Sequence, residues 1–70
     1  MKVREYREEK GYTQKRIAEI LGISQQAYSK KEKGLRGFTV EELLILEEVL
    51  EASISELFKE VKEKINKNIN

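Results

Sequence analysis

The chain has no cysteine and no histidine among its 70 residues. Without cysteine, disulfides and thiolate metal sites are excluded, and without histidine little remains that could bind a transition metal. The same absences remove most nucleophile–base pairs, so we expect no catalytic site, no metal and no cofactor. At this length a hydrophobic core alone barely holds a fold. The core must therefore come from helix packing or from a partner subunit.

Long apolar runs are missing as well. No stretch approaches the roughly 20 residues that a membrane span needs. Residues 1–4 lead into a charged amphipathic segment rather than a signal peptide. The four glycines fall at predicted breaks, so no glycine-rich phosphate loop occurs. We therefore expect a cytoplasmic protein with no membrane contact and no evident small-molecule ligand.

Charge is nearly balanced in total but uneven along the chain. The formal net charge is +1. Residues 1–37 contain 10 Lys/Arg and 5 Glu, whereas residues 38–70 contain 4 Lys and 8 Glu. This asymmetry fits a domain that turns a basic face to phosphate and an acidic face away from it. Ordinary scatter of surface charge is the alternative.

The stretch Thr13–Gly34 contains the start and stop signals of two short helices joined by a tight turn. Thr13 and Ser24 can each accept a hydrogen bond from a free N–H group of the following turn. Gly22 can take the left-handed conformation that ends a helix, and Ile23 would pin the turn to the core. The pattern therefore predicts a helix-turn-helix with helices at 14–21 and 25–33.

Four short motifs lie at fixed distances within this stretch. They are Thr13-Gln14, Ile17-Ala18, Leu21-Gly22-Ile23-Ser24 and Glu32-Lys33-Gly34. Together with REEKG at 7–11 and SISELF at 53–58, they resemble the lambda-repressor-like (Cro and XRE) helix-turn-helix family without a gap over roughly residues 3–58. The resemblance implies a compact all-α fold of five helices, with a DNA-binding domain at 1–58 and a C-terminal extension at 59–70.

The resemblance also assigns contacts to double-stranded DNA. Three residues of the second helix of the motif would reach base edges: Gln25, Gln26 and Lys30. A carboxamide suits this role because it can donate to and accept from adenine at once; plain surface polarity is the alternative. Phosphate contacts would come from Gln14, Ser29, Lys33 and Arg36, with Lys15, Arg16 and Lys31 as further candidates. For Lys15 and Arg16, simple solvation is the alternative.

Two positions of the resemblance concern the fold rather than DNA. Arg7 and Glu32 match a structural ion pair of the family. Lys31 stands where the family usually has an apolar residue. This departure predicts either that the helix at 25–33 is less firmly docked or that Lys31 extends to a phosphate.

The C-terminal half predicts two more helices, and a subunit interface. A capping box at Thr39 and Glu42 opens one helix, and Ser53 or Ser55 caps the next. An apolar stripe at helical spacing continues past the family's usual end, so that helix should run to about Asn66 and fray at its end. The predicted homodimer interface comprises Ile45, Phe58, Val61 and Ile65.

These features lead to one main hypothesis and one alternative. The main hypothesis is a sequence-specific regulator of transcription, a repressor, that binds a palindromic operator as a homodimer. The alternative is an antitoxin or adaptor with the same fold, whose partner is another protein held by the acidic, apolar C-terminal half.

Overall fold

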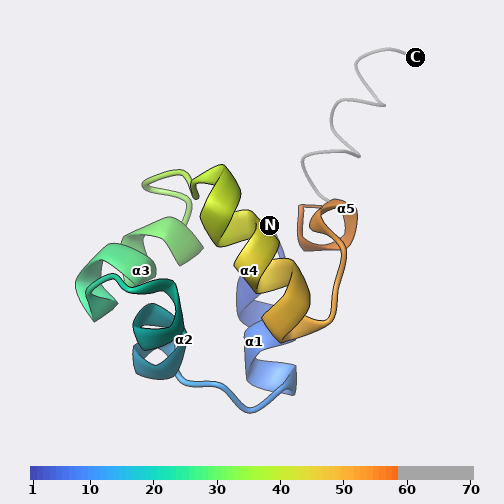
Figure 1. The fold of residues 1–70 in the computed structure, drawn as a ribbon, viewed down its shortest axis with the longest axis horizontal. Helices are drawn as coiled ribbons and strands as arrows, with labels where there is room; N and C mark the ends of the chain where they lie inside the picture. The colour runs from blue at the N-terminus through green and yellow to red at the C-terminus, as the bar shows by residue number, and fades with distance from the viewer. Residues whose placement is uncertain (59–70) are drawn as a thin grey trace.

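The computed structural model of the chain describes residues 1–58, and four of the five helices in that part begin at a residue whose side chain caps the helix. In order, the helices are α1 (Val3–Glu9), α2 (Gln14–Leu21), α3 (Gln25–Glu32), α4 (Val40–Leu50) and α5 (Ile54–Leu57). Figure 1 shows α2 and α3 together at one end, α1 and α4 in the middle, and α5 at the other end. Residues 1–58 contain no strand, which confirms the prediction of an all-α, five-helix fold.

The turn between α2 and α3 has the predicted caps. Thr13 Oγ1 accepts a hydrogen bond from the N–H of Arg16 at 3.0 Å, and Ser24 Oγ accepts one from the N–H of Ala27 at 3.1 Å. Gly22 has φ 74°, in the left-handed region that other residues rarely adopt. These local bonds fix where α2 ends and where α3 begins, which sets the angle between the two helices.

Two capping boxes open α4 and α5. Glu42 accepts from the N–H of Thr39 at 2.8 Å, while Thr39 Oγ1 accepts from the N–H of Glu42 at 3.1 Å. Ser53 and Glu56 repeat the arrangement, so Ser53 rather than Ser55 is the cap of α5. Each cap satisfies helix N–H groups that would otherwise have no partner, and contributes about 1 kcal/mol.

All five helices contribute side chains to one core. Its fully or almost fully buried apolar members are Val3, Ile17, Ala18, Tyr28, Leu46, Leu50, Ala52 and Leu57. Burying each large aliphatic side chain stabilises the fold by roughly 1.5–3 kcal/mol. The core therefore holds the pair α2–α3 against α1, α4 and α5, and gives α3 a fixed direction.

The end of α5 differs from the sequence prediction. The helix ends at Leu57, and Phe58, with φ −118° and ψ 31°, is no longer helical. The sequence predicted one helix to about Asn66. Val61, Ile65 and the rest of the predicted extension lie outside the described residues. In the described part of the chain, no helix combines the length and the apolar character that crossing a bilayer would require.

Candidate DNA-binding surface

The outward face of α3 is polar and carries no exposed carboxylate. Gln25, Gln26, Lys30 and Lys33 are exposed, and Ser29 is half-buried. The one acidic residue of α3, Glu32, is buried. The surface that α3 presents is therefore a mixture of amides and cations.

The structure brings residues of both helices to the same place. Gln14, from the first turn of α2, lines a shallow surface hollow together with Gln25, Gln26 and Ser29. Neither α2 nor α3 has an acidic residue in its first turn. The N–H ends of two helix dipoles and four polar side chains thus share one surface, an arrangement that favours an anion such as a phosphate.

A buried polar network under α3 holds this surface in place. Arg7 Nε donates to Glu32 Oε2 at 2.8 Å and Arg7 Nη2 donates to Glu32 Oε1 at 3.1 Å. Gln14 Nε2 donates to Glu32 Oε1 at 3.1 Å, and the hydroxyl of Tyr28 donates to Glu32 Oε2. Arg7 Nη1 also donates to the carbonyl of Tyr12 at 2.7 Å. The expected ion pair is present, and it ties α1 to α2 and α3.

Burial and hydrogen bonding act in opposite directions on Glu32. The side chains of Arg7 and Glu32 are only 8% and 3% exposed. Burial raises the pKa of the Glu32 carboxyl, but hydrogen bonds from Arg7, Tyr28 and Gln14 outweigh it and leave the pKa below its ordinary value. Burial, then the hydrogen bond to Glu32, raises the pKa of Tyr28. The network therefore contains an ionised carboxylate and a neutral phenol at neutral pH.

Lys31 occupies a position that the sequence did not predict. Its Nζ lies 2.7 and 2.8 Å from the two carboxylate oxygens of Glu42, and the two side chains are 13% and 9% exposed. Glu42 therefore takes part in the cap of α4 and, at the same time, accepts hydrogen bonds from the Lys31 ammonium of α3. Burial raises the pKa of Glu42, yet the bonds from Lys31 and Thr39 keep it below its ordinary value. The expectation that α3 is loosely docked is wrong, because Lys31 connects the end of α3 to α4.

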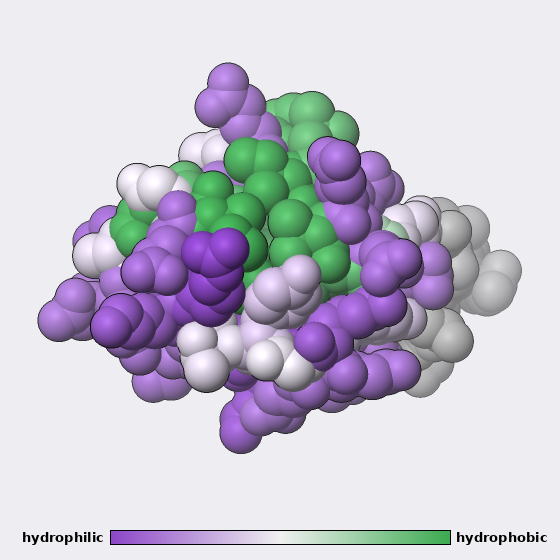
Figure 2. Space-filling view, turned by 60° about the horizontal axis from the view of Figure 1, so that its bottom comes forward, coloured by the Kyte–Doolittle hydropathy of each residue, from purple (hydrophilic) through white to green (hydrophobic). Residues whose placement is uncertain are grey.

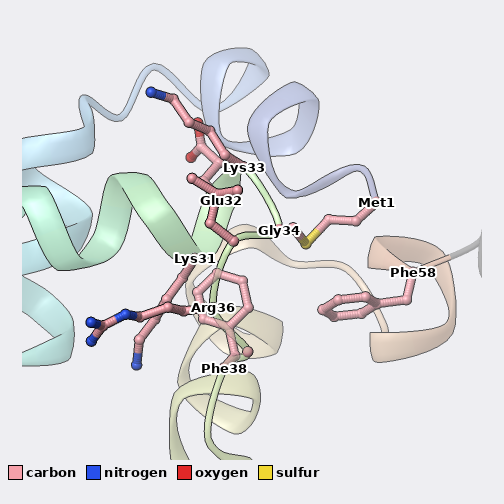
Figure 3. A pocket seen from close by; sticks show the side chains of 10 residues that line it. Met1, Lys31, Glu32, Lys33, Gly34, Arg36, Phe38 and Phe58 are labelled. Atoms are coloured by element: carbon pink, nitrogen blue, oxygen red, sulfur yellow. The ribbon is translucent and has the colours of Figure 1, made fainter.

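The remaining basic candidates are exposed. Lys15, Arg16 and Arg36 all lie on the surface, and Arg16 Nη1 is 3.7 Å from Glu19 on the same helix. Figure 3 shows the side chain of Arg36 extending away from Phe58, on the same side as Lys31. Arg36 belongs to the loop between α3 and α4, which starts with Gly34 at φ 82°. Arg36 and Lys33 therefore lie on either side of the turn that ends α3.

Two predicted interface residues lie in the described part, and neither is fully exposed. Ile45 and Phe58 are half-buried. The Phe58 ring packs edge-on against Phe38, with ring centroids 6.5 Å apart, beside a hollow of about 510 Å³ that Met1 also lines (Figure 3). The more exposed apolar residues of α4 are Val40 and Leu44, which the sequence reading did not assign to an interface.

The helix pair, its acid-free face and the basic turn after it define a helix-turn-helix DNA-binding domain. Comparison with known protein families makes this specific: residues 3–57 match the helix-turn-helix family of the Cro and XRE type, and the chain belongs to that family. The family binds DNA and is not catalytic. No curated protein and no solved structure matches the chain. Within residues 1–58, no cluster of acidic side chains is arranged to hold a metal ion.

Proposed function

We propose that the chain is a sequence-specific regulator of transcription, a repressor, that binds double-stranded DNA as a homodimer. The observation that carries the proposal is the inward position of Glu32. Because Arg7 neutralises this carboxylate in the interior, the only negative charge of α3 is removed from the face that would meet DNA. That face can then enter the major groove without repelling phosphates.

The exposed residues of α3 would read bases. Gln25 and Gln26 are in its first turn, where a carboxamide can bond adenine N6 and N7 together, and Lys30 follows one turn later, suited to guanine O6 or N7. All three are exposed on the helix. Base contacts of this kind supply sequence discrimination, whereas phosphate contacts supply only position.

A ring of donors around α3 would hold the phosphates. Gln14 has one amide N–H committed to Glu32, and since a carboxamide nitrogen carries two N–H groups, the second remains for DNA. The other proposed phosphate contacts are Ser29, Lys33, Arg36, Lys15 and Arg16. Lys31 is left out of this set because its ammonium is held by Glu42.

Two-fold symmetry would follow from the dimer. Ile45 and Phe58, together with Val61 and Ile65 from the C-terminal extension, are the proposed contacts between subunits. A symmetric dimer demands a palindromic operator whose half-sites lie about 34–36 Å apart, one helical turn or a multiple of it.

Selection from a random pool of duplex DNA, followed by sequencing, tests this function. We expect enrichment of a palindrome with half-site centres one helical turn apart. The variant Gln25→Ala/Gln26→Ala should lose the enrichment, and Ser55→Ala, an exposed change on α5, should keep it. Uniform binding that only weakens with salt would contradict sequence-specific recognition. A reporter promoter overlapped by the selected operator should be transcribed less in the presence of the chain, and increased transcription would contradict repression.

A further inference from the structure

The outer face of α4 combines apolar and acidic side chains. Two large apolar residues of α4 are exposed, Val40 at 73% and Leu44 at 55%. They are four residues apart, so they lie on the same side of the helix. The helix contains four Glu and no Lys or Arg, and Glu41 and Glu48 are exposed with them. Figure 2 shows that one face of the molecule has a continuous apolar patch among hydrophilic side chains.

The face continues into a shallow groove at the end of α4. Leu44, Ala52 and Ser53 line this groove with three glutamates, Glu47, Glu48 and Glu51, around a volume of about 500 Å³. The outer face of α4 and this groove will be called the α4 surface. Apolar surface edged by carboxylates suits a helix with an apolar stripe and basic flanks.

The chain itself contains a segment of that chemistry. Residues 59–70 follow the described part and contain four Lys and two Glu. Val61, Ile65 and Ile69 recur every four residues in it, which is the spacing of one side of an amphipathic helix. Its net positive charge and its apolar spacing both complement the α4 surface.

Geometry favours a second copy over the segment's own α4. Phe58 packs against the core, which α4 meets through Leu46 and Leu50, whereas Leu44 faces away from it. Val61 follows Phe58 by three residue steps, which span at most roughly 10 Å. A helix with its side chains is about 10–12 Å across, which is no shorter than this reach, so docking of Val61 on the α4 of a second copy is favoured over docking on its own α4.

We propose that residues 59–70 of one protomer dock on the α4 surface of a second copy of the chain. Val61 and Ile65 would contact Val40 and Leu44, and the lysines of the segment would face Glu41 and Glu48. The inference rests on the homodimer of the proposed function and names the surface that receives the C-terminal segment.

The absence of cysteine makes disulfide cross-linking a clean test. Chains carrying Leu44→Cys and chains carrying Ile65→Cys are mixed and oxidised gently. We expect a cross-linked pair of the two different chains, because the two sulfurs would be within bonding range only across the dimer. Glu19→Cys, an exposed position on α2, should give far less cross-link with Ile65→Cys. Equal yields would overturn the assignment.

Two further experiments distinguish docking on a second copy from docking on the same chain and from a surface that is not used for dimerisation. A single chain with both Leu44→Cys and Ile65→Cys should form cross-links between chains; a disulfide within one chain would mean docking in cis and would overturn the proposal. In sedimentation experiments, Leu44→Glu should weaken dimerisation at least tenfold. Leu35→Glu, at an even more exposed apolar position outside α4, should leave the dimerisation constant unchanged. Circular dichroism confirms that both variants remain folded.

Failure of this interface can be told from failure of the DNA-binding function. A chain that selects a palindrome but dimerises equally well with Leu44→Glu would refute the α4 surface alone. A dimer that cross-links through Leu44 but selects no DNA sequence would refute the regulator and leave the interface standing. A chain that stays monomeric at all concentrations would overturn the inference, and would leave the α4 surface to a different protein.

Discussion

Replacing Glu32 with Gln should destabilise the domain by about 3–5 kcal/mol, the usual cost of leaving one partner of a buried ion pair without the other. The change keeps the size of the side chain but leaves the buried Arg7 guanidinium without a counter-charge, with the Tyr12 carbonyl and one amide oxygen as its acceptors. It also places an amide, which has N–H donors of its own, among the four donor groups that the carboxylate now satisfies. A domain of 70 residues has roughly 4–10 kcal/mol of stability in total. The loss is therefore a large share of the whole.

Urea unfolding followed by circular dichroism measures this loss, and a double-mutant cycle separates the pair from its surroundings. Arg7→Met/Glu32→Gln should cost less than the sum of the single changes, by about 1–3 kcal/mol. Arg4 and Glu8 provide a matched control, an exposed pair at 3.5 Å four residues apart on α1. The coupling energy between Arg4 and Glu8, measured in the same way, should stay below about 0.5 kcal/mol. Additive costs for the buried pair, each under about 1 kcal/mol, would refute the reasoning.

The pH dependence of stability should change with the same substitution. The pKa of Glu32 is lowered in the folded chain from an ordinary value of 4.5. Between the folded and the ordinary pKa, the unfolded chain binds a proton that the folded chain does not, so stability rises with pH. The contribution is fully present above about 4.5 and is lost as the pH falls through the folded pKa. The pKa of Glu42 is lowered as well and acts in the same direction. The free energy of unfolding of Glu32→Gln should therefore still fall toward acid pH, but less steeply than that of the original chain. The same steepness in both chains would contradict the role given to Glu32.

Three further predictions concern single side chains of the DNA-binding surface and its support. Gln25→Ala should cost about 1–3 kcal/mol on the selected operator and relax preference at one base pair; an equal loss on random duplex would contradict base readout. Lys33→Ala should weaken binding to all sequences alike and lower the salt slope by about one unit, as measured by titration at several salt concentrations. Lys31→Met should destabilise the fold by about 1–3 kcal/mol, because Glu42 keeps a buried charge without its cation. A chemical unfolding midpoint that stays the same while DNA affinity falls would show that Lys31 contacts phosphate instead.

Local signals in the sequence predicted the framework of the fold. Thr13 and Ser24 begin helices because a side-chain oxygen reaches N–H groups only two or three residues away, so both partners can be read from adjacent positions. Gly22 ends α2 because its left-handed φ favours a residue without a side chain. Such interactions depend little on the rest of the chain, which is why these boundaries match the structure.

Contacts between helices were harder to predict. Lys31 and Glu42 are separated by the loop between α3 and α4, and their pairing depends on how that loop folds. The outer face of α4 was also hard to assign: residues 43–46 are four consecutive apolar residues, and the sequence analysis gave Ile45 of these to an interface. The structure turns Leu44 outward and leaves Ile45 half-buried. Only the packing of the core against α4 decides between them.

The position of Glu32 links the stability of the domain to its proposed recognition of DNA. One carboxylate binds Arg7 of α1 and Gln14 of α2 while belonging to α3. The same residue therefore removes negative charge from the outer face of α3, holds that helix against its neighbours and orients an amide at the start of α2. An uncharged residue at this position would leave the face equally free of acid, so electrostatics alone does not require a glutamate. What requires it is the buried guanidinium of Arg7, which needs a counter-charge wherever α1 meets α3. A variant that keeps α3 polar but loses this pair should thus bind DNA with less sequence discrimination, since base contacts depend on the exact placement of the helix more than phosphate contacts do.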